Sequence, residues 1–440
     1  MEILRKRYLD KLISKKDNGQ VKVITGLRRS GKTYLLKNIY MKWLEQNGIP
    51  KDHILFIALD QNKNSKYRNP ILLDQFLREE IKKRSGRCYV MIDEIQYAVP
   101  VPNPDIPAAV QTKKNAITFY DTILGLMDIC DLYVTGSNSE MLSSDILTNF
   151  RGRGDEVRVY PLSYSEYYNA YKGDKGNAWR DYLFYGGMPL VLSKEDSGEK
   201  GAYLKDLFEK TYSDDILERN HIKSKDDLGR VVDCLASTLG SFVNPTNIAN
   251  ILGNDNKKAL ARNTVADYIE HCKKAFLIEE AKRFDIRGKE YITGQQKYYF
   301  TDVGLRNARL NFRQFDVPHL IENVVYNELR IRDLSVDVGR VQIRSKNKKG
   351  DYQTTSLESD FVVNDLDRRF YIQVTEGIDD PGKKEQEMRS LLHIRDSFPK
   401  IILVNQDIPM YHSEEGIIFL SIKEFLLDET LTFKLFAHKM

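Results

Sequence analysis

The chain has 440 residues, of which 41% are hydrophobic and 10% aromatic, and its formal net charge is +4 at pH 7. This length predicts two or three domains, and the share of apolar and aromatic residues excludes a disordered protein. The charge permits a nucleic-acid partner without requiring one, and no apolar run reaches the roughly 18 residues of a membrane helix, so we expect no membrane partner.

The first recognisable motif lies near the N-terminus. Gly26–Thr33 fits the pattern G-x-x-x-x-G-K-[ST], the P-loop that holds nucleotide phosphates. Val21–Ile24 before it predicts a buried strand, and Tyr34–Tyr40 after it predicts a helix. The glycines let the backbone approach the phosphates, and the helix N-terminus offers free N–H groups to an anion. We therefore expect ATP and Mg²⁺ as cofactors, bound by Gly26, Leu27, Arg28, Arg29, Ser30, Gly31, Lys32 and Thr33.

Two residues of this loop have more specific expected roles. Lys32 would reach the β- and γ-phosphates, and the Thr33 hydroxyl would bind Mg²⁺. The apolar run Cys88–Ile92 predicts a buried parallel strand beside the P-loop strand, and it ends in Asp93 and Glu94. Asp93 is the predicted second Mg²⁺ ligand, and Glu94 is the predicted general base that polarises the attacking water.

A proline-rich segment follows. Val99–Pro107 contains four prolines in nine residues, which excludes a helix or a central strand. We expect a surface insertion between Asp93-Glu94 and a helix over Ile117–Met127. The insertion is either a partner-binding loop or a tolerated surface loop.

A third strand, Asp131–Thr135, leads into a polar turn at Gly136–Ser139. In a doubly wound sheet, a polar residue at this point would lie near the γ-phosphate. Ser137 or Asn138 is therefore a candidate sensor of the attacking water, although the same residues suit the N-cap of a helix that begins near Glu140.

Taken together, the motifs resemble a large prokaryotic family of AAA-type P-loop ATPases that carry a C-terminal domain of unknown function. Besides the P-loop, the resemblance rests on Asp93–Gln96, Thr135–Ser139, Phe150–Arg153, Tyr160–Tyr167, Tyr185–Pro189 and Tyr298–Arg306. It covers nearly the whole chain, and the proline-rich insertion departs from the compact family pattern. It implies an α/β AAA-type ATPase core with a parallel sheet, then a winged helix, then a C-terminal domain similar to the PD-(D/E)xK nuclease fold.

We predict four domains from this resemblance. The boundaries are 1–160 for the ATPase core, 161–225 for a helical segment, 226–300 for the winged helix-turn-helix and 301–440 for the nuclease-like domain. Arg153 lies where such ATPases place an arginine contact to the γ-phosphate, with Arg151 as the second choice and a surface turn as the alternative. An arginine acting from a neighbouring subunit would require a homo-oligomer, whereas a contact within the chain would not.

The middle of the chain supports a winged helix from its own residues. Asn244 and Pro245 suit an N-cap and a first helical position, a second helix is expected over Ala261–Lys274, and Phe276–Ala281 would begin the wing. In DNA readers the second helix enters the major groove. Here it would present Arg262, Asn263 and Thr264 after Lys257 and Lys258, while Asp267, Glu270, Glu279 and Glu280 dilute the positive field. DNA contact and a lid or protein-docking role remain open alternatives.

The C-terminal region predicts a helix over Ile321–Leu329 followed by strands. Nuclease chemistry of this fold needs metal-binding carboxylates and a lysine. Asp360 would be the first carboxylate, joined by Glu322 or Glu328, but the expected carboxylate-x-lysine is replaced by Gln373-Val374-Thr375. Since loss of one such electrostatic group costs about 10²–10³ in rate, we expect a degenerate nuclease fold that can still bind nucleic acid or mediate assembly.

The sequence thus predicts a Mg²⁺-dependent ATPase that couples its nucleotide state to double-stranded DNA or a protein. Its expected catalytic residues are Lys32, Glu94, Ser137, Asn138 and Arg153. The alternative is a nucleic-acid-binding or defence-related effector with negligible ATP turnover, or an active metal-dependent DNA nuclease. The four scattered cysteines form no C-x-x-C, and Met1–Arg7 lacks the apolar core of a signal peptide, so we expect a cytoplasmic protein.

Overall fold

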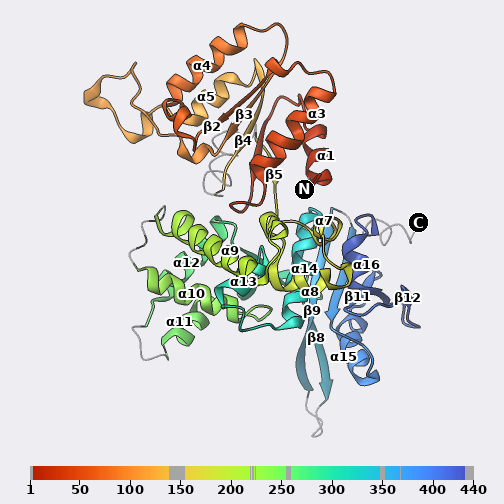
Figure 1. Ribbon diagram of the computed structural model, residues 1–440. Coiled ribbons are helices and arrows are strands. Elements are labelled where there is room, and N and C mark those ends of the chain that lie inside the picture. Colours follow the sequence, from red (N-terminus) through yellow and green to blue (C-terminus); the bar gives the residue numbers. More distant parts are fainter. Residues whose placement is uncertain are drawn as a thin grey trace. The chain divides into compact units, whose positions relative to one another are not determined.

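The computed structural model describes residues 3–137, 154–218, 220, 222, 224–253, 259–346, 352–366 and 368–431. The chain forms two compact units (Figure 1). The first unit is Met1–Pro161 with Lys274–Phe276, and the second is Leu162–Lys273 with Leu277–Met440. Among the residues described, no helix is both long and apolar enough to cross a bilayer.

The first unit is built on a five-stranded parallel sheet in the order β2-β3-β4-β1-β5. The strands are β1 (Val21–Thr25), β2 (Ile54–Ala58), β3 (Cys88–Asp93), β4 (Cys130–Thr135) and β5 (Gly154–Arg158). This confirms the predicted parallel sheet and the three predicted strands. The expectation that β3 lies directly beside the P-loop strand β1 was wrong, because β4 lies between them.

Helices cover both faces of this sheet (Figure 1). On one face, α4 (Pro70–Lys82) and α5 (Phe119–Leu126) pack against the strands. On the other lie α1 (Lys6–Ser14) and a continuous helix made of α2 (Lys32–Tyr34), a π-helical stretch (Leu35–Tyr40) and α3 (Met41–Gln46). Successive strand residues serve opposite faces, so that Val23 joins the α4 and α5 core while Ile24 joins the core beneath Leu35. The inner strands β1, β3 and β4 are therefore buried at every residue, whereas the edge strand β5 is mostly polar and only partly buried.

The proline-rich insertion has neither a long helix nor a sheet strand, as predicted. An antiparallel bridge between Val101 and Ile117, with N–H···O distances of 2.8 and 3.0 Å, closes it. Between these residues lie two short 3₁₀ turns, Ala108–Val110 and Lys113–Asn115. Because Ile117 belongs to this bridge, α5 begins at Phe119, and the Asp121 carboxylate accepts the backbone N–H of Thr118 at 2.8 Å.

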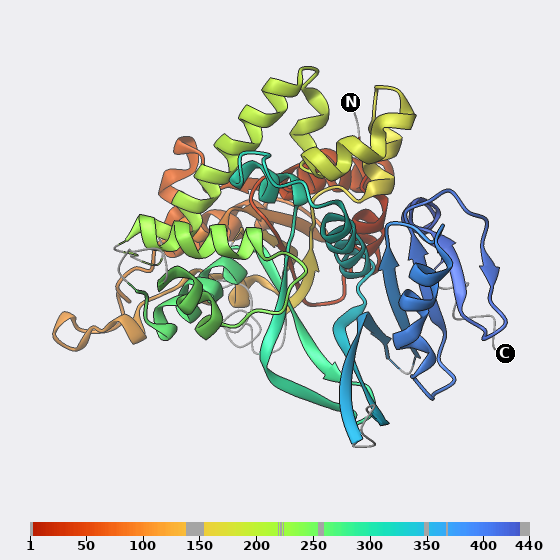
Figure 2. The ribbon, with the colours of Figure 1, turned by 90° about the horizontal axis from the view of Figure 1, so that it is seen from below.

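The second unit contains an eight-stranded mixed sheet in the order β12-β13-β11-β10-β9-β8-β6-β7. The strands are β6 (Ile278–Asp285), β7 (Glu290–Phe300), β8 (Ser335–Lys346), β9 (Tyr352–Asp365), β10 (Arg368–Thr375), β11 (Lys400–Val404), β12 (Tyr411–His412) and β13 (Ile418–Ser421). Its helices are α7 (Tyr164–Ala170), α8 (Ala178–Tyr185), α9 (Ser197–Lys210), α10 (Lys225–Ser237), α11 (Pro245–Gly253), α12 (Arg262–Lys274), α13 (Val303–Arg309), α14 (Val317–Ile331), α15 (Pro381–Leu392) and α16 (Ile422–Leu427). A π-helical stretch, Thr211–Glu218, continues α9. Figure 2 shows the long hairpin of β8 and β9 beside the helices of this unit.

Helices α10, α11 and α12 are followed directly by the hairpin β6–β7. Val243, between α10 and α11, bridges to Gln296 of β7, and Asn244 caps α11 by accepting the N–H of Asn247 at 2.7 Å. These are the elements that the winged-helix prediction requires, and the assignment itself stays a prediction. The hairpin continues into the large sheet, because β6 pairs in parallel with β8. The expected boundary at residue 300 therefore falls inside one sheet.

Two of the sequence motifs meet inside the second unit. Asp302, 3% exposed, accepts the backbone N–H of Gly187 at 2.7 Å and caps α13 by accepting that of Leu305 at 2.9 Å. A Cβ added at Gly304 would lie 2.0 Å from the carbonyl oxygen of Tyr185, so only glycine permits this approach. Burial raises the pKa of Asp302 to about 6. The motifs Tyr185–Pro189 and Tyr298–Arg306 thus pack directly against each other.

Candidate nucleotide-binding site

The P-loop joins β1 to α2 at the carboxyl end of the sheet. Its backbone takes positive φ at Gly26 (132°), Arg29 (64°) and Gly31 (104°). Lys32 is 4% exposed, and its Nζ donates to the carbonyl oxygens of Gly26 at 2.9 Å and Leu27 at 3.0 Å. The loop backbone thereby fixes the position of the ammonium that the sequence assigns to the phosphates.

The first glycine of the loop packs against the chain that leaves β5. A Cβ added at Gly26 would lie 2.1 Å from the carbonyl oxygen of Val159, whose own N–H bonds the carbonyl oxygen of Thr25 at 2.8 Å. The P-loop and the segment after β5 are consequently in backbone contact, which leaves no room for a side chain at position 26.

The N-terminal residues add a second connection to the P-loop. The Arg5 guanidinium donates to the carbonyl oxygen of Ser30 at 3.5 Å and to that of Tyr160 at 2.5 Å. The N–H of Tyr160 donates to the Tyr8 hydroxyl at 3.1 Å, and Arg5 lies 4.6 Å above the Tyr8 ring. No sequence signal pointed to Arg5 or Tyr8, because both lie well before the motif.

The structure brings Thr33 and Asp93 together. The Thr33 hydroxyl lies 2.9 and 3.1 Å from the two carboxylate oxygens of Asp93, and the Thr135 hydroxyl donates to one of them at 2.5 Å. Burial raises the pKa of Asp93, while the hydrogen bonds from Thr135 and Thr33 and the charge of Lys32 oppose that rise. A hydroxyl and a carboxylate this close form an oxygen donor set that fits Mg²⁺. Although β4 separates the two strands, its last residue, Thr135, holds the carboxylate in place.

Glu94 follows Asp93 in a left-handed conformation, with φ at 57°, which is uncommon for a residue other than glycine. Its N–H donates to the Thr135 hydroxyl at 2.9 Å. The Gln96 amide donates both to the Glu94 carboxylate and to the Ser137 hydroxyl, the latter at 3.3 Å. Ser137 is 1% exposed. Gln96 thus connects two of the predicted catalytic residues.

Sequence reasoning gave no functional role to Thr135 or Gln96. Each lies within two residues of a predicted site residue, Ser137 or Glu94, at the ends of the neighbouring strands β4 and β3. Their nearness to the predicted site residues at the strand ends was the signal that could have identified them. Asn138, Arg151 and Arg153 lie outside the described residues. The described residues that lie at the carboxyl end of this sheet are Lys32, Thr33, Asp93, Glu94, Gln96, Thr135 and Ser137.

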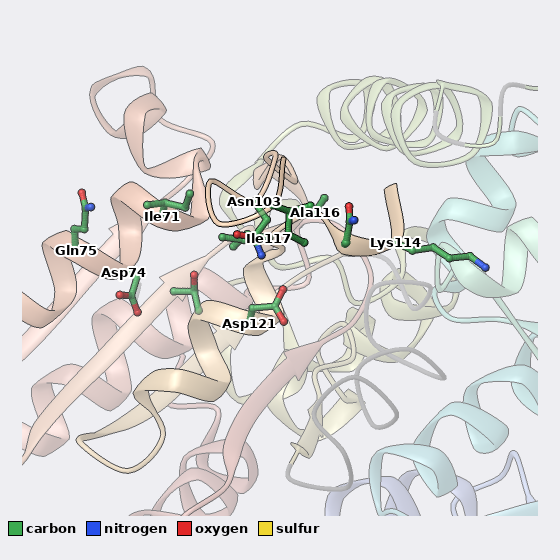
Figure 3. A pocket seen from close by; sticks show the side chains of 11 residues that line it. Ile71, Asp74, Gln75, Asn103, Lys114, Ala116, Ile117 and Asp121 are labelled. Atoms are coloured by element: carbon green, nitrogen blue, oxygen red, sulfur yellow. The ribbon is translucent and has the colours of Figure 1, made fainter. Parts of the chain in front are cut away.

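A separate pocket of about 600 Å³ lies in the first unit beside the proline-rich insertion (Figure 3). Its lining comes from α4, the insertion and α5, and comprises Ile71, Asp74, Gln75, Asn103, Ile106, Lys114, Asn115, Ala116, Ile117, Asp121 and Thr122. Since none of the P-loop residues lines it, this pocket is distinct from the nucleotide site.

The candidate nuclease residues of the second unit are only partly brought together. Glu322 of α14 and Asp360 of β9 lie with Glu358 in one cluster, whose carboxylate oxygens are within 4.8 Å of one another. Of the two alternatives, Glu322 is the one that lies beside Asp360, whereas Glu328 forms a buried ion pair with Arg332 at 2.8 Å.

Gln373-Val374-Thr375, which stands in place of the expected carboxylate-x-lysine, makes other contacts. Gln373 and Thr375 hydrogen-bond the carboxyl of Glu387 on α15, and these bonds oppose the rise in its pKa that burial causes. Burial and the nearby Glu322 raise the pKa of Asp360. The two positions that would carry the carboxylate and the lysine of a nuclease therefore serve the packing of α15.

Comparison with known proteins identifies the family of this chain. Residues 18–168 match the model of an AAA domain, and residues 176–316 match a domain of unknown function (DUF8612). An uncharacterized protein of Haemophilus influenzae is 31% identical over 434 residues, which cover 97% of this chain and 98% of that protein. The chain belongs to the same family of AAA-domain proteins. Its first unit, with β1 to β5, is accordingly a P-loop ATPase domain of the AAA type.

Other proteins match this AAA-domain protein with lower similarity. Uncharacterized protein MJ1544 of Methanocaldococcus jannaschii is 25% identical over 349 residues, or 76% of this chain and 71% of that protein. The Orc1 protein of Aeropyrum pernix in complex with DNA matches with TM-score 0.32 and 10% identity, covering 71% of this chain and 93% of that one. Cdc6p from Pyrobaculum aerophilum matches with TM-score 0.27 and 10% identity, covering 73% and 94%.

Proposed function

We propose that this AAA-domain protein is a Mg²⁺-dependent ATPase that works as a switch, coupling its nucleotide state to a DNA or protein partner. The observation that carries the proposal is the meeting of Thr33 and Asp93 at 2.9 Å, at the end of a loop whose backbone holds Lys32. Cation, hydroxyl and carboxylate are the groups that a triphosphate and its magnesium require.

Each residue has a role in this proposal. The backbone N–H groups of Gly26–Thr33 cradle the phosphates, and Lys32 neutralises charge on the β- and γ-phosphates. Thr33 and Asp93 would hold Mg²⁺, and the ion would supply positive charge beside the phosphate oxygens. Glu94 takes a proton from the attacking water.

The remaining roles concern the γ-phosphate. Ser137 or Asn138 orients the attacking water, and Arg153 contacts the γ-phosphate from within the chain or from a second subunit. The left-handed backbone at Glu94 and the hydrogen bond from the Gln96 amide support the role of Glu94 as general base, because together they fix where its carboxylate points. We include Gln96 as a positioning residue for Glu94.

The partner side of the proposal rests on α12 and the hairpin that follows it. Arg262 and Asn263 are exposed at the first turn of α12, which is where a winged helix would meet DNA. Exposed Asp267 and Glu270 on the same helix oppose a phosphate backbone. Glu279, in contrast, does not dilute the positive field, because it is buried and paired with Arg330 at 3.0 Å. Lys257 and Lys258 lie outside the described residues.

The test is ATP hydrolysis by the purified protein with Mg²⁺, with and without double-stranded DNA, using Lys32→Ala and Glu94→Gln as matched variants. Hydrolysis that disappears in both variants supports the ATPase. Hydrolysis that persists in Lys32→Ala refutes it. Stimulation by DNA that weakens steeply with salt identifies the partner as DNA, whereas indifference to DNA points to a protein. ATP binding without turnover favours the effector alternative.

A further inference from the structure

The acidic cluster of the second unit contains a cation of its own. Lys297 of β7 is 2% exposed, and its Nζ lies 2.8 Å from Glu322 and 2.5 Å from Glu358. Glu322 belongs to α14, and Glu358 to β9. One ammonium therefore engages two of the three carboxylates that lie within 4.8 Å of one another.

The oxygens of this cluster have other donors as well. The Tyr299 hydroxyl donates to Glu322 at 2.6 Å, on the same oxygen that accepts from Lys297. The backbone N–H of Val374 donates to Asp360 at 2.7 Å. All three carboxylates are thus engaged by groups that belong to the chain.

The resemblance to a nuclease fold would place a divalent ion at the carboxylates of Glu322, Glu358 and Asp360. Mg²⁺ takes oxygen ligands in near-octahedral geometry at about 2.0–2.1 Å and keeps several waters. An ion at this point would have to displace the Lys297 ammonium, which would then be buried without its two partners. Leaving a charge buried and unpaired is strongly unfavourable. The residues present do not fit a divalent metal site.

We infer that Lys297 is the resident cation of this cluster and stands in the place that a divalent ion would take in a nuclease of this fold. The cluster is then a structural element. It fastens β7, the second strand of the hairpin after α12, to helix α14 and to strand β9 of the large sheet. The inference is independent of the proposed ATPase, because all of these residues belong to the second unit.

A cation built into the chain makes the hairpin and the C-terminal sheet one connected body. Arg283 lies nearby on β6, where the charge of Glu358 acts on it, so a second cation contributes to the balance of charge. No exchange of ions with solvent is needed to neutralise Glu322 and Glu358. The contacts at Lys297 therefore persist whether or not divalent ions are present.

The experiment measures Mn²⁺ binding to the purified full chain without nucleotide, by the loss of the electron paramagnetic resonance signal of free Mn²⁺. Four proteins are compared: wild type, Asp360→Asn, Lys297→Met, and the double variant Lys297→Met with Asp360→Asn. Wild type and Asp360→Asn are expected to bind equal amounts of Mn²⁺. Lys297→Met is expected to gain one bound ion per chain, and the double variant to lose it. Any ion held at Asp93 and Thr33 contributes equally to all four.

Three results would overturn the inference. The first is an ion bound by wild type and absent from Asp360→Asn, which would make the cluster a metal site despite Lys297. The second is a folded Lys297→Met that gains no ion. If Lys297→Met does not fold, the comparison of wild type with Asp360→Asn still decides, and Lys297→Arg, which keeps the charge, is expected to fold and bind no additional ion. Mg²⁺- or Mn²⁺-dependent DNA cleavage that is lost in Asp360→Ala would also refute it.

Discussion

Gly26→Ala tests whether the contact between the P-loop and the chain after β5 sets the shape of the nucleotide site. Gly26 has φ at +132°, which side chains rarely adopt, and its added Cβ would lie 2.1 Å from the backbone carbonyl oxygen of Val159. The backbone strain costs about 1–3 kcal/mol. Relieving the overlap costs roughly another 1–3 kcal/mol. Because the obstacle is backbone, the relief has to come from the loop moving away from Val159, and the phosphate-binding N–H groups move with it.

Gly48→Ala is the matched control. Gly48 also has positive φ, at +87°, but its added Cβ meets nothing within 4 Å, and it lies after α3, outside the P-loop. It therefore carries the strain without the overlap. Titration with a fluorescent ATP analogue is expected to show an unchanged Kd for Gly48→Ala. For Gly26→Ala, an overlap of about 1–3 kcal/mol corresponds to a Kd roughly 5- to 150-fold weaker. A Kd within about threefold of wild type would refute the reasoning.

Four further predictions concern other residues of the two units. Lys32→Ala is expected to weaken ATP binding by at least about tenfold in calorimetric titration, because a charge-assisted hydrogen bond contributes about 1.5–3 kcal/mol; unchanged affinity would remove Lys32 from the site. Glu94→Gln is expected to keep the Kd for ATP while kcat falls by about 10²–10⁴, the range for loss of a general base. Gln96→Ala is expected to lower kcat and leave KM unchanged, because Gln96 holds Glu94 and Ser137, and a rise in KM alone would contradict that role. Burial gives Asp302 a pKa of about 6 in the folded state, so the free energy of unfolding should fall by about 1 kcal/mol as pH rises from 5 to 7, and urea unfolding of Asp302→Asn should lack this difference.

The sequence predicted the strands of the first unit better than their order in the sheet. The P-loop and the strands that became β1, β3 and β4 were each signalled by apolar runs that end in polar residues. The order of the strands had no local signal, because it depends on which apolar faces pack together. As a result β4 was not expected between β1 and β3, and neither was the use of Thr135 to hold Asp93.

In the second unit, local reasoning found two of the three clustered carboxylates. Glu322 and Glu328 are six residues apart on α14, which places them roughly 120° apart around the helix, so both could not face Asp360. That arithmetic was available from the sequence and limits the helix to one of the two carboxylates, without showing which. Lys297 had no such signal, because its hairpin was assigned to another domain and the packing of α14 against β7 brings it to Glu322. Arg153 and Asn138 remain predictions.

The hydrogen bonds of Arg5 and Tyr8 have a consequence for genetics. These residues belong to no nucleotide-binding motif, yet Arg5 holds the carbonyl oxygens of Ser30 in the P-loop and of Tyr160. A random mutation at position 5, or a gene start misplaced a few codons downstream, would impair ATP use and would look in a screen like a defect in the P-loop itself.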